Sequence, residues 1–336
     1  MKAAVLHEIN QPLSLESVPN PTPGPHDALI KVEACGVCHS DLHLAAGDWP
    51  QAIARRVKPT ILGHEVVGQV METGKEVKNF APGDRVGMGW LCSTCGTCEP
   101  CRTGDENICL ERQITGVAIQ GGFAEYFCGC ATHLVPVPAA LPAAEAAPLF
   151  CAGVTVHRSL RQAAVQPGWL VAVFGVGGLG HLAVQLIKQA GAKAVAVDVS
   201  PEKLALATAL GADHVFSADA AVDGLQSLGG VQAAIVTCAS KAAYDAAFRC
   251  LRKKGTLMVV GLPNDKLTFF ARDMVMGEFK IMGSAVGTRA DIRAVLELAS
   301  KQKVKCQVQT AKLEEINEIF DQMREGTLPA RTVVTF

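Results

Sequence analysis

The sequence predicts an α/β protein with two domains, one built on a doubly wound parallel sheet and the other mostly β. Its 336 residues are too many for one compact core and suit two domains. From Trp169 onward, apolar strand-like runs alternate with helical segments, which predicts a parallel sheet with helices on its faces. Before that point, short β-type runs are separated by Pro and Gly. We place the parallel-sheet domain at residues 153–287 and the β domain at 1–152 together with 288–336.

The β domain is expected to have short strands, such as Ala28–Glu33 and Val66–Val70, and a Pro-rich connection at 19–25. Near its C-terminal end we expect a helix at 291–300, a helix at 314–325 and a β run at 331–336.

The parallel-sheet domain begins with a βαβ unit. This unit consists of a strand at 170–174, a helix at 181–190 followed by Gly191, and a strand at 194–198. Ser200 and Pro201 then supply an N-cap and a favoured first helical residue, and Gly211 closes the helix that they start. Further strands are expected at Val215, at 233–238 and at 256–261. Together these strands are enough for a doubly wound sheet.

Composition argues against several classes of function. Hydrophobic residues make up 49% of the chain and charged residues 19%, with a net charge of −1, so no overall charge favours nucleic acid or an anionic membrane. Residues 1–10 lack a signal-peptide pattern, and no apolar run reaches membrane-spanning length. We therefore expect a cytoplasmic protein that binds neither nucleic acid nor membrane.

The expected turn between the first strand and helix of the parallel sheet has the pattern G-x-G-x-x-G. Its six residues are Gly175, Val176, Gly177, Gly178, Leu179 and Gly180. Such glycines let the backbone approach a pyrophosphate at a helix N-terminus. Asp198 ends the next strand, where a carboxylate accepts from ribose hydroxyls and repels a 2′-phosphate, so the pair favours NAD over NADP. Lys203 is a second ribose candidate, and a plain glycine turn with a solvated Asp198 and a surface lysine is the alternative.

Five of the thirteen cysteines lie between Cys92 and Cys109, and the odd total argues against a disulfide framework. Four of them, Cys95, Cys98, Cys101 and Cys109, have the spacing C-x₂-C-x₂-C-x₇-C. This spacing lets one loop surround a tetrahedral zinc with no position for water, which predicts a structural site in a lobe at about 90–110. Cys92 could replace Cys109 as the fourth ligand. We prefer Cys109, because the longer stretch of chain through Gly104 lets this last ligand reach the opposite side of the metal. Buried cysteines without a metal are the other alternative.

A second group of motifs identifies a family. The motifs are Cys35-Gly-Val-Cys38-His39-Ser40-Asp41-Leu-His43, then Gly63-His64-Glu65, then Phe150-Cys151-Ala-Gly153. With the cysteine lobe and the glycine loop, they occur in the order found in zinc-containing medium-chain alcohol dehydrogenases. The chain resembles that family over essentially its whole length, most closely the yeast and bacterial ethanol-type enzymes. The resemblance implies a GroES-like catalytic domain and a Rossmann domain that binds NAD.

The resemblance also implies that Cys38, His64 and Cys151 bind a catalytic zinc whose fourth position is open. A zinc held in this way lowers the pKa of a bound alcohol and, in the reverse direction, polarises an aldehyde carbonyl. Asp41 is expected to bind the other ring nitrogen of His64 and so to fix its tautomer. Glu65 is expected behind the metal or as a transient ligand, with a surface carboxylate as the alternative.

Further site residues follow from the same likeness. Ser40 and His43 resemble a proton relay that runs through the cofactor ribose. His39 and Arg331 match positions that contact the cofactor pyrophosphate, and an ordinary surface location is the alternative for each. Cys35 forms C-x-x-C with Cys38, so a redox pair is an alternative to a single ligand.

Trp49 and Trp90 match positions that line the substrate pocket, with core packing as the alternative. Two such rings would favour short or flat primary alcohols. The segment 51–57 is longer and more basic than usual and is expected to alter the pocket entrance, while Ala45 and Ala46 replace bulkier residues and are expected to widen the site.

The function expected is therefore the reversible, NAD-dependent oxidation of a short-chain or small aromatic primary alcohol to its aldehyde, with two zinc ions per chain. The resemblance implies a homotetramer. An NADP-linked aldehyde reductase or a polyol dehydrogenase is the alternative enzyme, and a zinc-ribbon-like nucleotide-sensing module is the non-enzyme alternative.

Overall fold

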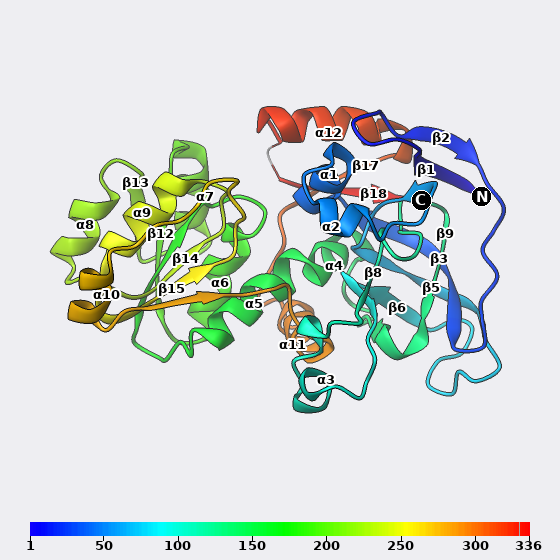
Figure 1. The fold of residues 1–336 in the computed structure, drawn as a ribbon, viewed down its shortest axis with the longest axis horizontal. Coiled ribbons are helices and arrows are strands. Elements are labelled where there is room, and N and C mark those ends of the chain that lie inside the picture. The colour runs from blue at the N-terminus through cyan, green and yellow to red at the C-terminus, as the bar shows by residue number, and fades with distance from the viewer. Residues whose placement is uncertain (329) are drawn as a thin grey trace. The chain divides into compact units, whose positions relative to one another are not determined.

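The computed structural model describes residues 1–328 and 330–336 (Figure 1). Its described residues form two compact units. Unit 1 comprises Met1–Cys151, Thr288–Lys301 and Cys306–Phe336, and unit 2 comprises Ala152–Gly287 and Gln302–Lys305. Unit 2 holds a parallel sheet and unit 1 is mostly β, so the predicted α/β class is confirmed.

Unit 2 is built on a six-stranded sheet in the order β13-β12-β11-β14-β15-β16, with every neighbouring pair parallel. The strands are β11 (Leu170–Phe174), β12 (Lys193–Asp198), β13 (His214–Ser217), β14 (Val231–Val236), β15 (Leu251–Val259) and β16 (Lys280–Gly283). The order reverses between β11 and β14, and ligands of doubly wound sheets bind at the carboxyl end of such a switch point. The glycine loop begins at this point, after Phe174.

The described part of unit 2 also contains six helices (Figure 1). They are α5 (Ala152–Gln162), α6 (Gly180–Gln189), α7 (Pro201–Ala209), α8 (Ala221–Ser227), α9 (Lys241–Arg249) and α10 (Ala271–Gly277). The predicted cap of α7 is confirmed, because the Ser200 hydroxyl accepts from the Lys203 N–H. β15 starts at Leu251, five residues before the expected start at 256. The prediction began too late because residues 252–254 are charged and exposed, so the first half of the strand does not look like a strand in the sequence.

Unit 1 contains a seven-stranded sheet in the order β10-β6-β5-β3-β18-β17, with β9 also paired to β3. Its strands are β3 (Asp27–Gly36), β5 (Val66–Thr73), β6 (Arg85–Met88), β9 (Tyr126–Cys130), β10 (Val135–Pro136), β17 (Val308–Ala311) and β18 (Arg331–Thr335). Smaller sheets pair β1 (Lys2–Leu6) with β2 (Ser14–Ser17) and β4 (Thr60–Ile61), and β7 (Leu91–Ser93) with β8 (Gln113–Ile114).

Two strand pairings in this sheet assemble the site described below. In the antiparallel pair β3·β5, Cys35 lies opposite Val66, which brings the segment after β3 to the segment before β5. In the antiparallel pair β3·β18, Cys35 lies opposite Val334 on its other side, so the C-terminal strand joins the same end of β3 (Figure 1).

The helices of unit 1 are short apart from two near the C-terminus. They are α1 (His39–Ala46), α2 (Pro50–Ile53), α3 (Glu99–Thr103), α4 (Ala143–Ala146), α11 (Arg289–Ser300) and α12 (Ile316–Glu325), with 3₁₀ turns η1 (Glu106–Ile108), η2 (Ala131–His133), η3 (Ala147–Phe150) and η4 (Leu313–Glu315). The expected helix at 314–325 is therefore a 3₁₀ turn that leads into α12. Among the described helices, none combines the length and apolar character needed to span a membrane.

Candidate active site and metal centres

Four buried side chains, Cys38, His64, Glu65 and Cys151, come together in unit 1. Their potential ligand atoms all lie within 4.8 Å of one another. Cys38 is the N-cap of α1, His64 and Glu65 directly precede β5, and Cys151 follows η3. The sequence prediction grouped Cys38, His64 and Cys151 as metal ligands, and the fold places the three side chains at one point.

The geometry of this group fits a metal ion. The Sγ atoms of Cys38 and Cys151 are 3.8 Å apart, and two sulfurs each about 2.3 Å from a tetrahedral zinc would lie about 3.8 Å apart. The buried Nε2 atom of His64 has no hydrogen-bond partner among the described residues, although buried polar atoms are nearly always paired. The Cys151 thiol, and after it His64, lower the pKa of Cys38, which favours the thiolate that binds metal.

The Asp41 carboxylate contacts both Cys38 and the Gly63–His64 segment. Its Oδ1 atom accepts from the Gly63 N–H at 3.1 Å and lies 2.9 Å from His64 Nδ1. Its Oδ2 atom accepts from the Cys38 N–H at 3.0 Å, which closes a capping box at the start of α1. A carboxylate only accepts, so a neutral His64 ring carries its hydrogen on Nδ1 and presents an unprotonated Nε2.

Glu65 and Arg331 form a buried ion pair that the sequence did not predict. Arg331 Nη2 donates to Glu65 Oε1, and the two side chains are 5% and 0% exposed. The surface alternatives considered for these residues are therefore wrong. Burial raises the pKa of Glu65 to about 7, against the opposing effect of Arg331. The C-terminal strand thus supplies a cation next to the ligand group.

An aromatic line connects His64 to His43. The His64 ring meets Trp90 edge-on at 4.8 Å between centroids, and Trp90 meets Trp49 edge-on at 6.2 Å. Trp49 stacks on His43 at 5.2 Å and an interplanar angle of 29°. Both tryptophans are half-buried and pack against the core of unit 1.

The remaining residues of the first helix differ in exposure. His39 is exposed and Ser40 is half-buried. Ala45 belongs to the apolar core of unit 1 and Ala46 is half-buried, and their expected widening of the site stays a prediction.

The basic segment 51–57 is anchored by one of its arginines. Arg56 donates to the carbonyls of Leu6 at 3.4 Å and His7 at 3.2 Å, and to Thr60 Oγ1 at 3.1 Å. The segment is thereby fixed to β1 and β4, and its effect on the pocket entrance stays a prediction.

The cysteine lobe brings Cys95, Cys98, Cys101 and Cys109 together, with their Sγ atoms within 4.8 Å of one another. Cys95 Sγ lies 3.9 Å from Cys101 Sγ and 3.6 Å from Cys109 Sγ, again close to the spacing around a tetrahedral zinc. The backbone N–H of Cys98 lowers the pKa of Cys95 to about 6. Cys92 lies outside this group, buried in the core of unit 1, so the geometry selects Cys109.

A hydrogen-bond network ties this lobe to α11. The backbone N–H and Nε of Arg289 reach Glu106 Oε1 at 3.1 and 3.2 Å, and its Nη1 donates to the Thr132 carbonyl at 2.6 Å. His133 Nδ1 lies 3.0 Å from Thr132 Oγ1, and its Nε2 lies 3.2 Å from Thr94 Oγ1, next to Cys95. Burial, and after it Arg289, lowers the pKa of His133 to about 4. No sequence pattern indicated this network.

The glycine loop of unit 2 connects β11 to α6. Gly175 has a φ of +95°, and a Cβ on Gly180 would meet the Gly175 carbonyl oxygen at 1.9 Å. A Cβ on Gly177, by contrast, would meet no atom of residues 1–328 or 330–336 within 4 Å, so the middle glycine faces open space there. Gly178 and Leu179 complete the turn, and Leu179 is the N-cap of α6. The loop therefore leaves room for a group that binds against its backbone.

Asp198 lies at the end of β12 and contacts this loop. Its Oδ2 atom accepts from the Val176 N–H at 2.6 Å and its Oδ1 atom from the Ser200 N–H at 3.0 Å. Asp198 is buried, so the alternative of a solvated strand end is wrong. Lys203, in the first turn of α7, is half-buried.

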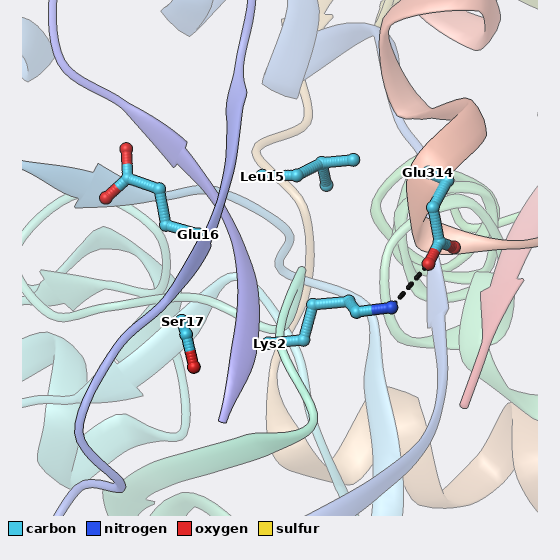
Figure 2. Close-up of a pocket in the computed structure, with 5 residues that line it drawn as sticks. All are labelled: Lys2, Leu15, Glu16, Ser17 and Glu314. Atoms are coloured by element: carbon cyan, nitrogen blue, oxygen red, sulfur yellow. Dashed lines mark hydrogen bonds and ion pairs between the residues drawn. The ribbon is translucent and has the colours of Figure 1, made fainter.

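A hollow elsewhere on unit 1 is lined by Lys2, Leu15, Glu16, Ser17 and Glu314 (Figure 2). Two of these residues, Lys2 and Glu314, form an exposed ion pair of 2.5 Å between Nζ and Oε1. The hollow contains no residue of either metal-ligand group, and we place no chemistry there.

Comparison with known proteins agrees with this geometry. A model of the alcohol dehydrogenase GroES-like domain matches residues 24–139, and a model of the zinc-binding dehydrogenase family matches residues 178–301. An alcohol dehydrogenase of Rhizobium meliloti (strain 1021) is 46% identical over 99% of this chain and 98% of the relative, and one of Geobacillus stearothermophilus is 44% identical over 99% of each. The crystal structure of an alcohol dehydrogenase from Aeropyrum pernix is similar with a TM-score of 0.92 at 37% identity, covering 100% of both chains.

Proposed function

The chain belongs to the zinc-containing medium-chain alcohol dehydrogenases, and from this premise we propose that it oxidises a primary alcohol reversibly to its aldehyde with NAD as hydride acceptor. The observation that carries the proposal is the buried Nε2 of His64, which has no hydrogen-bond partner in the described part of the chain and lies beside two cysteine sulfurs 3.8 Å apart. A non-enzymatic metal module would have no use for this second donor set.

We assign the catalytic zinc to Cys38, His64 and Cys151, and a structural zinc to the four cysteines of the lobe. When bound at the first set, zinc supplies a Lewis acid that lowers the pKa of an alcohol hydroxyl and polarises an aldehyde carbonyl. Asp41 keeps the His64 ring in the ligand tautomer. Glu65 is proposed as a nearby carboxylate held by Arg331, which keeps its charge balanced inside the protein.

The hydroxyl proton needs an acceptor, and we assign this role to Ser40 and His43. Ser40 is half-buried at the start of α1, two residues after the ligand Cys38. His43 is on the same helix and partly exposed, and an imidazole is a common general base. Ser40 would hand the proton toward His43, which returns it to solvent.

We propose NAD as the cofactor because of the glycine loop and Asp198. The open space at Gly177 and the N-terminus of α6 suit a pyrophosphate. The Asp198 carboxylate retains lone pairs for ribose hydroxyls and would repel a 2′-phosphate. Lys203 is proposed beside the ribose and exposed His39 at the pyrophosphate. Arg331 remains a pyrophosphate candidate only through the guanidinium nitrogens that Glu65 leaves free.

The substrate we propose is a short-chain or small aromatic primary alcohol. Trp90 lies against the ligand His64 and Trp49 lies against Trp90, so two rigid rings narrow the space on that side of the metal group. A polyol dehydrogenase would need hydrogen-bonding groups where these rings lie. An NADP-linked aldehyde reductase would have to bind the 2′-phosphate of NADP despite the negative charge of Asp198.

We also propose a homo-oligomer, with a tetramer implied by the family. Large apolar side chains are exposed at and near α10, where Phe270 is 81%, Val275 72% and Met276 69% exposed. Exposed apolar groups of this size mark a surface that a partner covers. A cytoplasmic location is proposed from the thirteen free cysteines, because thiolate sites persist where thiols stay reduced.

The decisive experiment is a steady-state rate panel of linear, branched, aromatic and polyhydric alcohols with NAD and NADP, together with a metal count on the purified chain. We expect two zinc ions per chain and the highest kcat/KM with NAD and a short or aromatic primary alcohol. One zinc and no alcohol-dependent NADH formation would refute the proposal, and a preference for NADP or for polyols would replace it with the alternative enzyme.

A further inference from the structure

His43 is held by the chain that immediately follows its own helix. α1 ends at Ala46, and Gly47 takes the left-handed conformation with a φ of +87°. The chain then reverses, and the Asp48 N–H donates to the His43 carbonyl at 3.0 Å, as in a Schellman-type cap. This reversal brings the Asp48 carboxylate back to the His43 ring, where Oδ2 lies 2.7 Å from Nδ1.

The cap does not need the side chain of Asp48. The capping bond uses the backbone N–H, which every residue except proline would supply. The carboxylate makes a separate, charge-assisted contact with the ring. The side chain is therefore available for a role other than ending the helix.

Trp49 fixes the face of the same ring. It follows Asp48 directly, and its indole stacks on the imidazole at 5.2 Å with an interplanar angle of 29°. The Nδ1 bond fixes the edge of the ring and the stack fixes its plane, although the His43 side chain remains 29% exposed. Three consecutive residues, Gly47, Asp48 and Trp49, thus determine the orientation of His43.

The contact also selects a tautomer. A carboxylate has no hydrogen to donate, so the hydrogen of a neutral His43 is on Nδ1 and the lone pair is on Nε2. We propose that Asp48 is a positioning residue that holds His43 in this tautomer and orientation, so that Nε2 accepts the proton leaving the substrate hydroxyl. This inference rests on the relay role proposed above for His43.

The proton balance is simple. The hydroxyl proton reaches Nε2 by way of Ser40, the ring becomes an imidazolium, and the Asp48 carboxylate opposite Nδ1 stabilises that cation. Release of the proton from Nε2 to water restores the starting tautomer. The carboxylate itself takes up no proton in this sequence of steps and acts only through the ring.

The test is a double-mutant cycle between Asp48 and His43, with the single-turnover rate of NADH formation from ethanol or benzyl alcohol as the readout. Asp48→Ala keeps the backbone cap, and we expect a loss of roughly 10-fold to 100-fold with little change in the KM for alcohol. Asp48→Asn should lose as much, because an amide can accept from or donate to Nδ1, and Asp48→Glu should recover part of the rate. In a His43→Ala background, Asp48→Ala should have no further effect.

The control is Asp321→Ala, which removes another exposed aspartate that bonds a neighbouring basic side chain, here Arg324. It should leave the rate unchanged. A rate loss for Asp48→Ala that persists in full in the His43→Ala background would overturn the inference. If His43→Ala slows the reaction and Asp48→Ala does not, only the role of Asp48 is wrong. An unchanged rate for His43→Ala would remove the relay itself and the inference with it.

A second readout does not depend on turnover. In ¹⁵N spectra of histidine-labelled protein, the His43 signals are those absent from His43→Ala. We expect them to report the Nδ1–H tautomer in the native chain and a shift toward Nε2–H in Asp48→Ala. Identical His43 signals in the two proteins would show that Asp48 does not select the tautomer.

Discussion

His64 and Asp41 are joined by a buried contact of 2.9 Å between Nδ1 and Oδ1. The same carboxylate accepts from the backbone of Cys38 and of Gly63, so one side chain orients two of the proposed ligands. Because α1 begins at the next residue after Cys38, the capping of that helix and the geometry of the metal group depend on the same acid.

Asp41→Asn should therefore weaken metal binding at the Cys38, His64 and Cys151 site. An amide does not fix the tautomer of His64, and loss of such a partner lowers metal affinity about 10-fold to 100-fold. Competition with a chromogenic chelator would measure it, with the four-cysteine lobe as an internal reference that keeps its zinc. Equal affinity in the variant and the native protein would show that Asp41 serves only as a helix cap.

The two cysteine groups should respond differently to the loss of one sulfur. Cys151→Ser removes a proposed ligand at an open site, so we expect turnover to be lost with little change in Tm. Cys98→Ser removes one of four proposed ligands in a lobe whose residues are mostly exposed or half-buried, so we expect a clear fall in Tm. Metal analysis and thermal melts on both variants would check the division. If Cys151→Ser lowered Tm and Cys98→Ser abolished turnover instead, the catalytic and structural roles of the two cysteine groups would have to be exchanged.

The parts of the site that lie close together in sequence could be predicted from it. The C-x₂-C-x₂-C-x₇-C loop and the glycine loop each bring their residues together within one turn or two, so spacing alone describes their geometry. Strands 170–174 and 194–198 were equally clear, because buried parallel strands are continuous apolar runs.

Contacts between distant segments could not be predicted in the same way. Arg331 and Glu65 are 266 positions apart, and Arg289 and Glu106 are 183 apart. Each pair depends on the order of strands or on where α11 returns to unit 1, which local patterns do not encode. A solvated position stayed open as the alternative for Asp198 and Glu65 for the same reason, since a lone carboxylate in a sequence is usually exposed.

Replacement of Asp198 by glycine should change cofactor preference. The substitution removes the charge that would face a 2′-phosphate, so we expect kcat/KM to fall with NAD and the ratio of NADP to NAD efficiency to rise. Asp198 also accepts from Val176 and Ser200, so thermal melts must show that the loop remains folded. An unchanged ratio in a folded variant would mean that another residue discriminates between the cofactors.

Loss of Glu65 should be costly because it leaves a buried guanidinium without its partner. We expect Glu65→Gln to lower the free energy of unfolding by about 3–5 kcal/mol. The exposed pair Glu297 and Lys301 offers a control, because Glu297→Gln should change stability by less than about 1 kcal/mol. Adding Arg331→Met to Glu65→Gln should restore part of the stability, as denaturant unfolding would show. If the double variant were less stable than Glu65→Gln alone, the uncompensated charge of Arg331 would not be the cause of the lost stability.

His133 should make stability fall in mild acid. Burial and Arg289 lower its folded-state pKa to about 4, whereas an unfolded histidine titrates near 6.5. Well above pH 6.5, His133 is neutral in both the folded and the unfolded state, and its contribution to stability is complete. As the pH falls through this window, the unfolded state binds a proton that the folded state does not, and stability drops by about 1.4 kcal/mol per unit, or roughly 3 kcal/mol by pH 4.

His133→Asn should therefore flatten this acid limb, even if its stability at pH 7 is lower because the bonds to Thr94 and Thr132 change. Urea unfolding of both proteins at intervals from pH 7 to pH 4 would show the difference between the two curves. Protonation of the thiolates at the proposed metal sites affects both proteins equally and cancels in that difference. Parallel curves across the window would mean that His133 takes up its proton in the folded protein as readily as in the unfolded chain.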